Sequence, residues 1–180
     1  MSTHADVVQM AGYNAWMNAK LYESAAKLTP AALAEDRGAF FGSLLGTLNH
    51  LVVGDTIWLQ RFAKHPAAHA SLDPVRALEP PTALDQVLFD SLEPLRERRQ
   101  LLDGAINRWA AELSDADLQH VFEYKNMRGI ASRKRFASLV THFFNHQTHH
   151  RGQATTLLFQ AGQDVGVTDL LALISNEPDA

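Results

Sequence analysis

The chain has 180 residues, of which 46% are hydrophobic and 20% are charged, and its formal net charge is -4 at pH 7. A single domain commonly has about 100–200 residues, so residues 1–180 are expected to form one globular domain, and the composition excludes a disordered or fibrous chain. The negative charge argues against a general nucleic-acid-binding protein, and the absence of cysteine excludes disulfides, cysteine nucleophiles and thiolate metal sites.

The sequence predicts no association with a membrane. It contains no apolar run as long as a membrane-spanning helix, which needs roughly 18 residues. The first residues also lack the charged-then-apolar order of a signal peptide. We therefore expect a cytoplasmic protein.

Apolar residues at helical spacing predict two helices in the first third of the chain. The first covers residues 6–28 and the second residues 40–64, and each ends before a proline. Within the second helix, His50 has Gly46 and Gly54 four residues away on either side. Because a glycine inside a helix costs about 1 kcal/mol relative to alanine, these glycines indicate either space beside the imidazole or close packing with another helix.

The middle of the chain is predicted to be a long loop followed by a third helix. Residues 65–81 are rich in proline and alanine, and the prolines disfavour the regular helix on which His65 and His69 would share a metal. The third helix is expected to start after an N-cap at Thr82, to end near Trp109 and to bend at Pro94. Its expected buried stripe is Leu84, Val87, Leu88, Leu92, Leu95, Leu102, Ile106 and Trp109.

The last third is predicted to contain a small hairpin and a fourth long helix. Residues 120–124 are typical of a strand and residues 126–129 of a turn, and the helix is expected over residues 136–160. A short helix over residues 167–174 would close the chain. These elements predict an all-α fold, a four-helix bundle with a small irregular or hairpin insertion before its last long helix.

Several polar residues are expected simply to face solvent. Arg99 lies among other charged residues on the third helix, and the basic residues 133–135 follow the predicted turn. His4 and His120 are also expected at the surface.

Four of the nine histidines lie close together on the fourth helix. At about 100° per residue, His150 falls within the apolar arc and His146 at its edge, whereas His142 and His149 lie farther out. Histidines four residues apart can bind one metal ion, although the glutamate of the HExxH metalloprotease motif is missing. The same pattern would also fit a helix with histidines on its surface.

A third ligand must come from another helix, and His50 is the only histidine inside the second. Three imidazoles with an open coordination position are typical of catalytic zinc sites. Nickel and iron also accept imidazole ligands. The sequence therefore predicts a divalent metal bound by His50, His146 and His150.

Three sequence blocks and the ending GVTDLLALI resemble the DinB family of DNA-damage-inducible proteins and the related bacillithiol S-transferase-like enzymes. The resemblance covers nearly the whole chain. It implies a four-helix bundle with an unusual connection order, a divalent metal on the same three histidines and commonly a homodimer. The blocks are YNAWMN at 13–18, LNHLVVGDTIWLQRF at 48–62 and NHQTHHRGQ at 145–153.

The resemblance also implies a reaction in which the metal, zinc or nickel, lowers the pKa of a low-molecular-weight thiol. The protein would then be a thiol S-transferase or isomerase acting on a small molecule, and the thiol would supply the nucleophile that a cysteine-free chain lacks. Two alternatives stay open: a metal-dependent hydrolase, for which Asp55 is the candidate base, and a non-catalytic metal-binding module of a stress response. Candidate contacts around the metal or substrate are Tyr13, Asn14, Asn18, Asp55 and Arg151.

Overall fold

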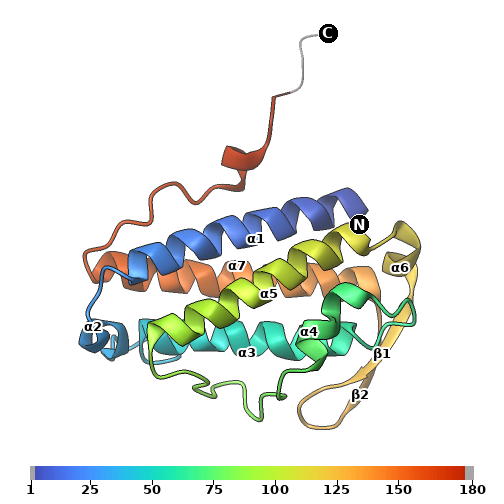
Figure 1. The fold of residues 1–180 in the computed structure, drawn as a ribbon, viewed down its shortest axis with the longest axis horizontal. Helices are drawn as coiled ribbons and strands as arrows, with labels where there is room; N and C mark the ends of the chain where they lie inside the picture. Colours follow the sequence, from blue (N-terminus) through green and yellow to red (C-terminus); the bar gives the residue numbers. More distant parts are fainter. Residues whose placement is uncertain (1–2, 177–180) are drawn as a thin grey trace.

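Four long helices make up half of residues 3–176, the part of the chain that the computed structural model describes (Figure 1). They are α1 (His4–Ala25), α3 (Leu44–Phe62), α5 (Leu92–Glu112) and α7 (Phe136–Gln160). Helices α1 and α3 each pack against both α5 and α7. Each long helix therefore has two long neighbours around a shared core.

Short elements connect the long helices. A two-stranded antiparallel sheet follows α6 and directly precedes α7 (Figure 1). The short elements are α2 (Pro30–Ala34), η1 (Ala70–Leu72), α4 (Asp73–Arg76), α6 (Asp115–Gln119), β1 (Val121–Lys125), β2 (Ala131–Arg135) and η2 (Leu170–Leu173).

The core between the long helices is apolar and rich in aromatic rings. Phe62 of α3 stacks on Trp109 of α5 with ring centroids 5.2 Å apart, and Phe143 of α7 meets Phe62 edge to face at 5.7 Å. All three side chains are almost fully buried. Burial of such rings is the main stabilising contribution that joins these helices.

The predicted hairpin is confirmed. Val121 pairs with Arg135 at one end of the two strands and Lys125 with Ala131 at the other. Gly129 takes a φ of 76° in the turn, a conformation that glycine adopts without strain. The chain is thus mostly helical, and its small sheet is the hairpin insertion that was expected before the last long helix.

The third helix starts ten residues later than predicted, at Leu92 instead of Thr82. Residues 82–91 stay irregular because the Asn49 side chain accepts hydrogen bonds from the backbone N–H groups of Leu88 and Phe89, at 2.9 and 3.0 Å. Pro94 falls in the first turn of α5, where its missing N–H breaks no helical bond.

Two expected members of the buried stripe lie on this irregular segment. Leu84 is 52% exposed and Val87 is 60% exposed, so their assignment to the core was wrong. Among the helices described, none is long and apolar enough to cross a membrane.

Candidate metal centre

The three histidines selected from the sequence converge between α3 and α7. Nε2 of His50 lies 3.2 Å from Nε2 of His146 and 3.1 Å from Nε2 of His150. The Phe41 ring stacks on His50 with centroids 3.9 Å apart and meets His150 edge to face. Together these histidines form a group whose ligand atoms are close enough to hold one metal ion.

Hydrogen bonds at the far side of two rings fix their tautomers. Nδ1 of His50 lies 2.8 Å from the Leu84 carbonyl oxygen, and Nδ1 of His150 lies 2.7 Å from Oε1 of Gln153. Both oxygens can only accept, so each Nδ1 carries the ring proton and each Nε2 is left with a lone pair. Two lone pairs facing each other at 3.1 Å repel unless a cation lies between them, so this arrangement fits a divalent metal.

The environment also keeps the imidazoles uncharged. Burial lowers the pKa of His50 and of His150. For His146, burial together with the neighbouring histidines lowers the pKa to about 3. A neutral imidazole is the form that coordinates a metal, so all three side chains are in that form near neutral pH.

Gly46 and Gly54, each four residues from His50, make room for groups other than the His50 ring. A Cβ at Gly54 would lie 2.9 Å from Cε1 of His146, so this glycine gives room to the α7 ligand. A Cβ at Gly46 would collide with the Phe41 carbonyl oxygen. The expected space next to His50 is therefore space for its partner His146 and for the chain that leads into α3.

The remaining histidines of the α7 cluster lie outside the converging group. His142 stands edge to face against Trp58, with centroids 5.1 Å apart. His149 is exposed, and its Nε2 lies 3.4 Å from the Gln153 amide nitrogen. The structure thus separates the four histidines of this helix in the way that the helical periodicity predicted.

The histidines outside α7 and α3 differ in part from the expectation that they lie at the surface or apart on a loop. His4 and His120 are partly buried, not fully exposed, and Nε2 of His4 contacts the Ala110 carbonyl oxygen at 3.0 Å. His65 and His69 lie close together beside Asp117 in a second group of possible ligands. The irregular loop does not keep these two histidines apart.

A cavity of about 390 Å³ opens beside the candidate metal centre. His50, Gly54 and His146 form one part of its wall, and Trp58 and His142 form another. A ligand in this cavity would lie next to His50 and His146, two of the three converging histidines.

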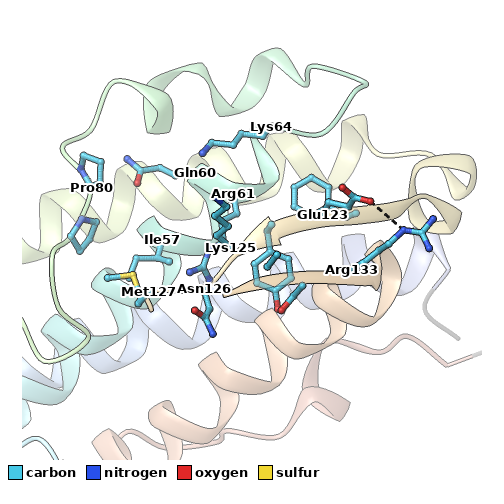
Figure 2. Close-up of a pocket in the computed structure, with 15 residues that line it drawn as sticks. Ile57, Gln60, Arg61, Lys64, Pro80, Glu123, Lys125, Asn126, Met127 and Arg133 are labelled. Carbon is cyan, nitrogen blue, oxygen red and sulfur yellow. Dashed lines mark ion pairs between the residues drawn. The ribbon is translucent and has the colours of Figure 1, made fainter. Parts of the chain in front are cut away.

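A second cavity of about 750 Å³ lies beneath the hairpin, and Figure 2 shows its lining. The two cavities share the lining residues Ile57, Arg61, Asn126 and Met127. They are therefore neighbours, and together they extend from the metal centre to the sheet.

Positive charge predominates around the larger cavity. Arg61, Lys64 and Lys125 line it, whereas its one acidic side chain, Glu123, is paired with Arg133 at 3.2 Å (Figure 2). Cations gathered around a cavity attract anionic ligands.

Arg61 lies where the two cavities meet. Its guanidinium stacks on Trp58 at 4.8 Å and on Tyr124 at 5.3 Å from the ring centroids. Burial lowers its pKa, and no carboxylate among the described residues forms an ion pair with it. A partly buried arginine of this kind is a site for an anionic group.

Most of the candidate contact residues form a buried polar network away from the cavity walls. The side-chain amides of Asn14 and Asn18 donate to Oδ1 of Asp103, at 3.1 and 2.9 Å, and Arg151 donates to Asn14. Tyr13 instead donates to the Thr168 carbonyl oxygen at 2.7 Å, which ties the C-terminal segment to α1.

Asp55 is paired with Arg99 in the same network, and Arg99 also bridges to Asp103 at 3.0 Å. Burial alone would lower the pKa of Arg99, but the carboxylates of Asp103 and Asp55 outweigh it and raise the pKa. Arg99 was expected on a solvated face, and this is wrong because two buried carboxylates on α3 and α5 surround it. Asp55 is thus held in an ion pair and is not available as a base.

Comparison with known proteins identifies relatives over the whole length. A model of the DinB family matches residues 1–180. Protein DinB from Bacillus subtilis (strain 168) is 24% identical over 160 residues, which covers 87% of this chain and 87% of that protein. The crystal structure of a DinB-like protein from Bacillus cereus ATCC 10987 superposes with a TM-score of 0.63, at 21% identity over 91% of this chain and 95% of that chain.

Proposed function

The chain belongs to the DinB family, and on that premise we propose that it is a divalent-metal-dependent thiol S-transferase or isomerase that acts on a small molecule. The observation that carries the proposal is the convergence of three histidine Nε2 atoms at 3.1 and 3.2 Å beside an open cavity. We also interpret the ring of four long helices as the four-helix bundle of this family.

The ligands would be His50, His146 and His150, and the metal zinc or nickel, with iron as a further possibility. When bound, such an ion supplies Lewis acidity that lowers the pKa of a thiol held beside it. The protein's own contribution is to orient the ligands, through the Leu84 carbonyl and the Gln153 amide. Phe41 covers the rings of His50 and His150 on one side and shields them from water.

We propose that the substrate, or the thiol itself, is anionic and occupies the joined cavities. Arg61 would hold the negative group between the metal centre and the hairpin, with Lys64 and Lys125 nearby. In the transfer, the thiol sulfur forms a bond to an electrophilic carbon, the leaving group departs with the electron pair, and the thiol proton goes to a base. His142 lines the cavity, and burial lowers its pKa, so it offers an uncharged imidazole for that proton.

The metal assignment is tested by metal content. His146→Ala and His150→Ala should each abolish stoichiometric binding at this centre, because either change leaves only two ligands. His149→Ala is the matched control from the same helix, since its side chain is exposed, and it should bind metal like the wild type. Equal metal content in all three variants would overturn the assignment.

The reaction is tested with metal-loaded protein, electrophilic substrates and a panel of cellular thiols. Thioether products should form with the wild type and should fall to background with His146→Ala. If the wild type holds its metal but yields neither a thiol-transfer nor an isomerisation product, the non-catalytic metal-binding module is the better description. The hydrolase alternative is less well supported, because its candidate base, Asp55, is held in an ion pair with Arg99.

A further inference from the structure

A second group of metal-binding side chains lies where the connector after α3 meets α6. His65 follows the end of α3 and His69 precedes η1, and both are buried, with 5% and 4% of their surface exposed. Asp117 projects from α6. One ring nitrogen of each histidine and one carboxylate oxygen of Asp117 lie within 4.8 Å of one another.

The two histidines have unused nitrogen atoms at this point. Nε2 of His65 and Nε2 of His69 are both buried, and neither has a hydrogen-bond partner among the described residues. Buried polar atoms are nearly always satisfied, because an unpaired one loses its bonds to water without replacement. Two buried ring nitrogens without partners, in a group that also contains a carboxylate, indicate that a partner is missing at this point.

Hydrogen bonds hold the Asp117 carboxylate in a fixed position beside the two histidines. Its Oδ2 accepts hydrogen bonds from the backbone N–H of Ser114 at 2.8 Å and from the Ser114 hydroxyl at 2.7 Å, as part of the capping box of α6. Burial would raise the pKa of Asp117, but these hydrogen bonds lower it further, so the group is an anionic carboxylate. Oδ1 is left available as a ligand.

The turn between the histidines must adjust when a metal binds. Nδ1 of His65 accepts the backbone N–H of Ala67 at 3.2 Å, which leaves the ring proton on Nε2. Coordination through Nε2 moves that proton to Nδ1, and the bond from Ala67 must then open. Ala68 in the same turn has a φ of 51°, a strained conformation for a residue with a Cβ, so this turn is already held in a conformation that it does not favour.

We propose that His65, His69 and Asp117 form a second divalent-metal site, distinct from the centre between α3 and α7. Two imidazoles and a carboxylate are a donor set typical of zinc. His120, whose ring centroid lies 4.8 Å from that of His65, is the nearest candidate for a fourth ligand. Such a site would fasten the connector after α3 to α6 and to the start of the hairpin, and it would be structural.

The test is the number of metal ions per full-length chain. Protein stripped with a chelator, reloaded with Zn²⁺ and desalted should retain two ions per chain by mass spectrometry of the metal. His69→Ala and Asp117→Asn should each retain one, His146→Ala should also retain one, and the His69→Ala/His146→Ala double variant none. Asp117→Asn keeps an oxygen that can accept from Ser114, so it tests the ligand role without removing the helix cap.

Two further measurements separate the outcomes. Circular dichroism should show wild-type helix content in each single variant, and Co²⁺ bound to His146→Ala should still give the visible absorption of a nitrogen- and oxygen-coordinated ion. One Zn²⁺ per wild-type chain, with none left in His146→Ala, would overturn the second site but support the first. Two ions in both His69→Ala and Asp117→Asn would also overturn it.

Discussion

At position 54, the absence of a side chain determines how closely α3 can approach the His146 ring. A Cβ there would lie 2.9 Å from Cε1 of His146, closer than side chains tolerate. We expect Gly54→Ala to displace His146 and weaken metal binding about tenfold to a hundredfold, as changes to groups that orient a ligand commonly do. Titration of the stripped protein with Zn²⁺ against a competing chelator measures this.

The matched control is Gly152→Ala on α7, two residues from His150, where an added Cβ meets no atom within 4 Å. Both substitutions improve helix propensity by up to about 1 kcal/mol. In Gly54→Ala the contact with the His146 ring opposes this gain, so only Gly152→Ala is expected to keep the full thermal stability. Unchanged metal affinity in Gly54→Ala would show that the ring moves aside at no cost to the site.

The candidate ligands could be predicted from the sequence because their arrangement is mostly local. His146 and His150 share a helix, so their relative position follows from helical periodicity alone. Gln153 lies in the same histidine block, three residues after His150, and its place on that face follows from the same periodicity. Leu84 could not be predicted, because its carbonyl reaches His50 only when residues 82–91 remain irregular.

At the scale of secondary-structure elements, the largest error was the start of the third helix. Apolar periodicity extends back to Leu84, but the Asn49 side chain on α3 binds the backbone of Leu88 and Phe89. Two side chains of α3, Asn49 and His50, thus bind a segment whose own pattern is helical and hold it in an irregular conformation. The hairpin and the bounds of α7 were predictable, because turn residues and flanking apolar residues determine them locally.

The buried pair of Asp55 and Arg99 joins α3 to α5. Removal of Arg99 leaves the carboxylates of Asp55 and Asp103 without their shared cation, so we expect Arg99→Gln to destabilise the fold by about 3 kcal/mol. Urea denaturation of the metal-free protein measures this. Glu123→Gln is the control, because the pair of Glu123 with Arg133 is exposed and should contribute less than about 1 kcal/mol. Equal losses in the two variants would contradict the proposed importance of burial.

The hairpin and the end of α3 together form the cationic cavity, and Arg61 belongs to both cavities. We expect Arg61→Gln to raise the KM for a carboxylate-bearing thiol such as mercaptosuccinate about tenfold, since a charge-assisted hydrogen bond contributes roughly 1.5–3 kcal/mol. The KM for neutral 2-mercaptoethanol and the metal content should stay unchanged.

The control for this change is Arg108→Gln, which removes an exposed arginine of α5 that does not line either cavity. An equal rise in KM for both thiols in Arg61→Gln would mean that the arginine shapes the cavity and does not recognise charge.

At the scale of the whole molecule, the C-terminal segment leaves the helices and extends beyond α1 (Figure 1). Much of its apolar surface is uncovered: Leu171 is 74% exposed, Val167 is 59% exposed and Ile174 is 47% exposed. The Tyr13 bond to the Thr168 carbonyl anchors the segment to α1. An apolar segment that is anchored but uncovered is typical of a surface that another chain covers.

We therefore predict that the protein is a homodimer in which residues 167–174 pack against the second copy. Light scattering after size-exclusion chromatography should give twice the mass of the 19.9 kDa chain. Leu171→Asp should shift this toward the monomer, because a charge cannot be buried unpaired at an apolar interface, while helix content and metal content stay constant. Val87→Asp, which places the same charge on an exposed residue of another segment, should remain dimeric. A wild-type mass of one chain, or a dimer that Leu171→Asp leaves intact, would exclude this segment as the interface.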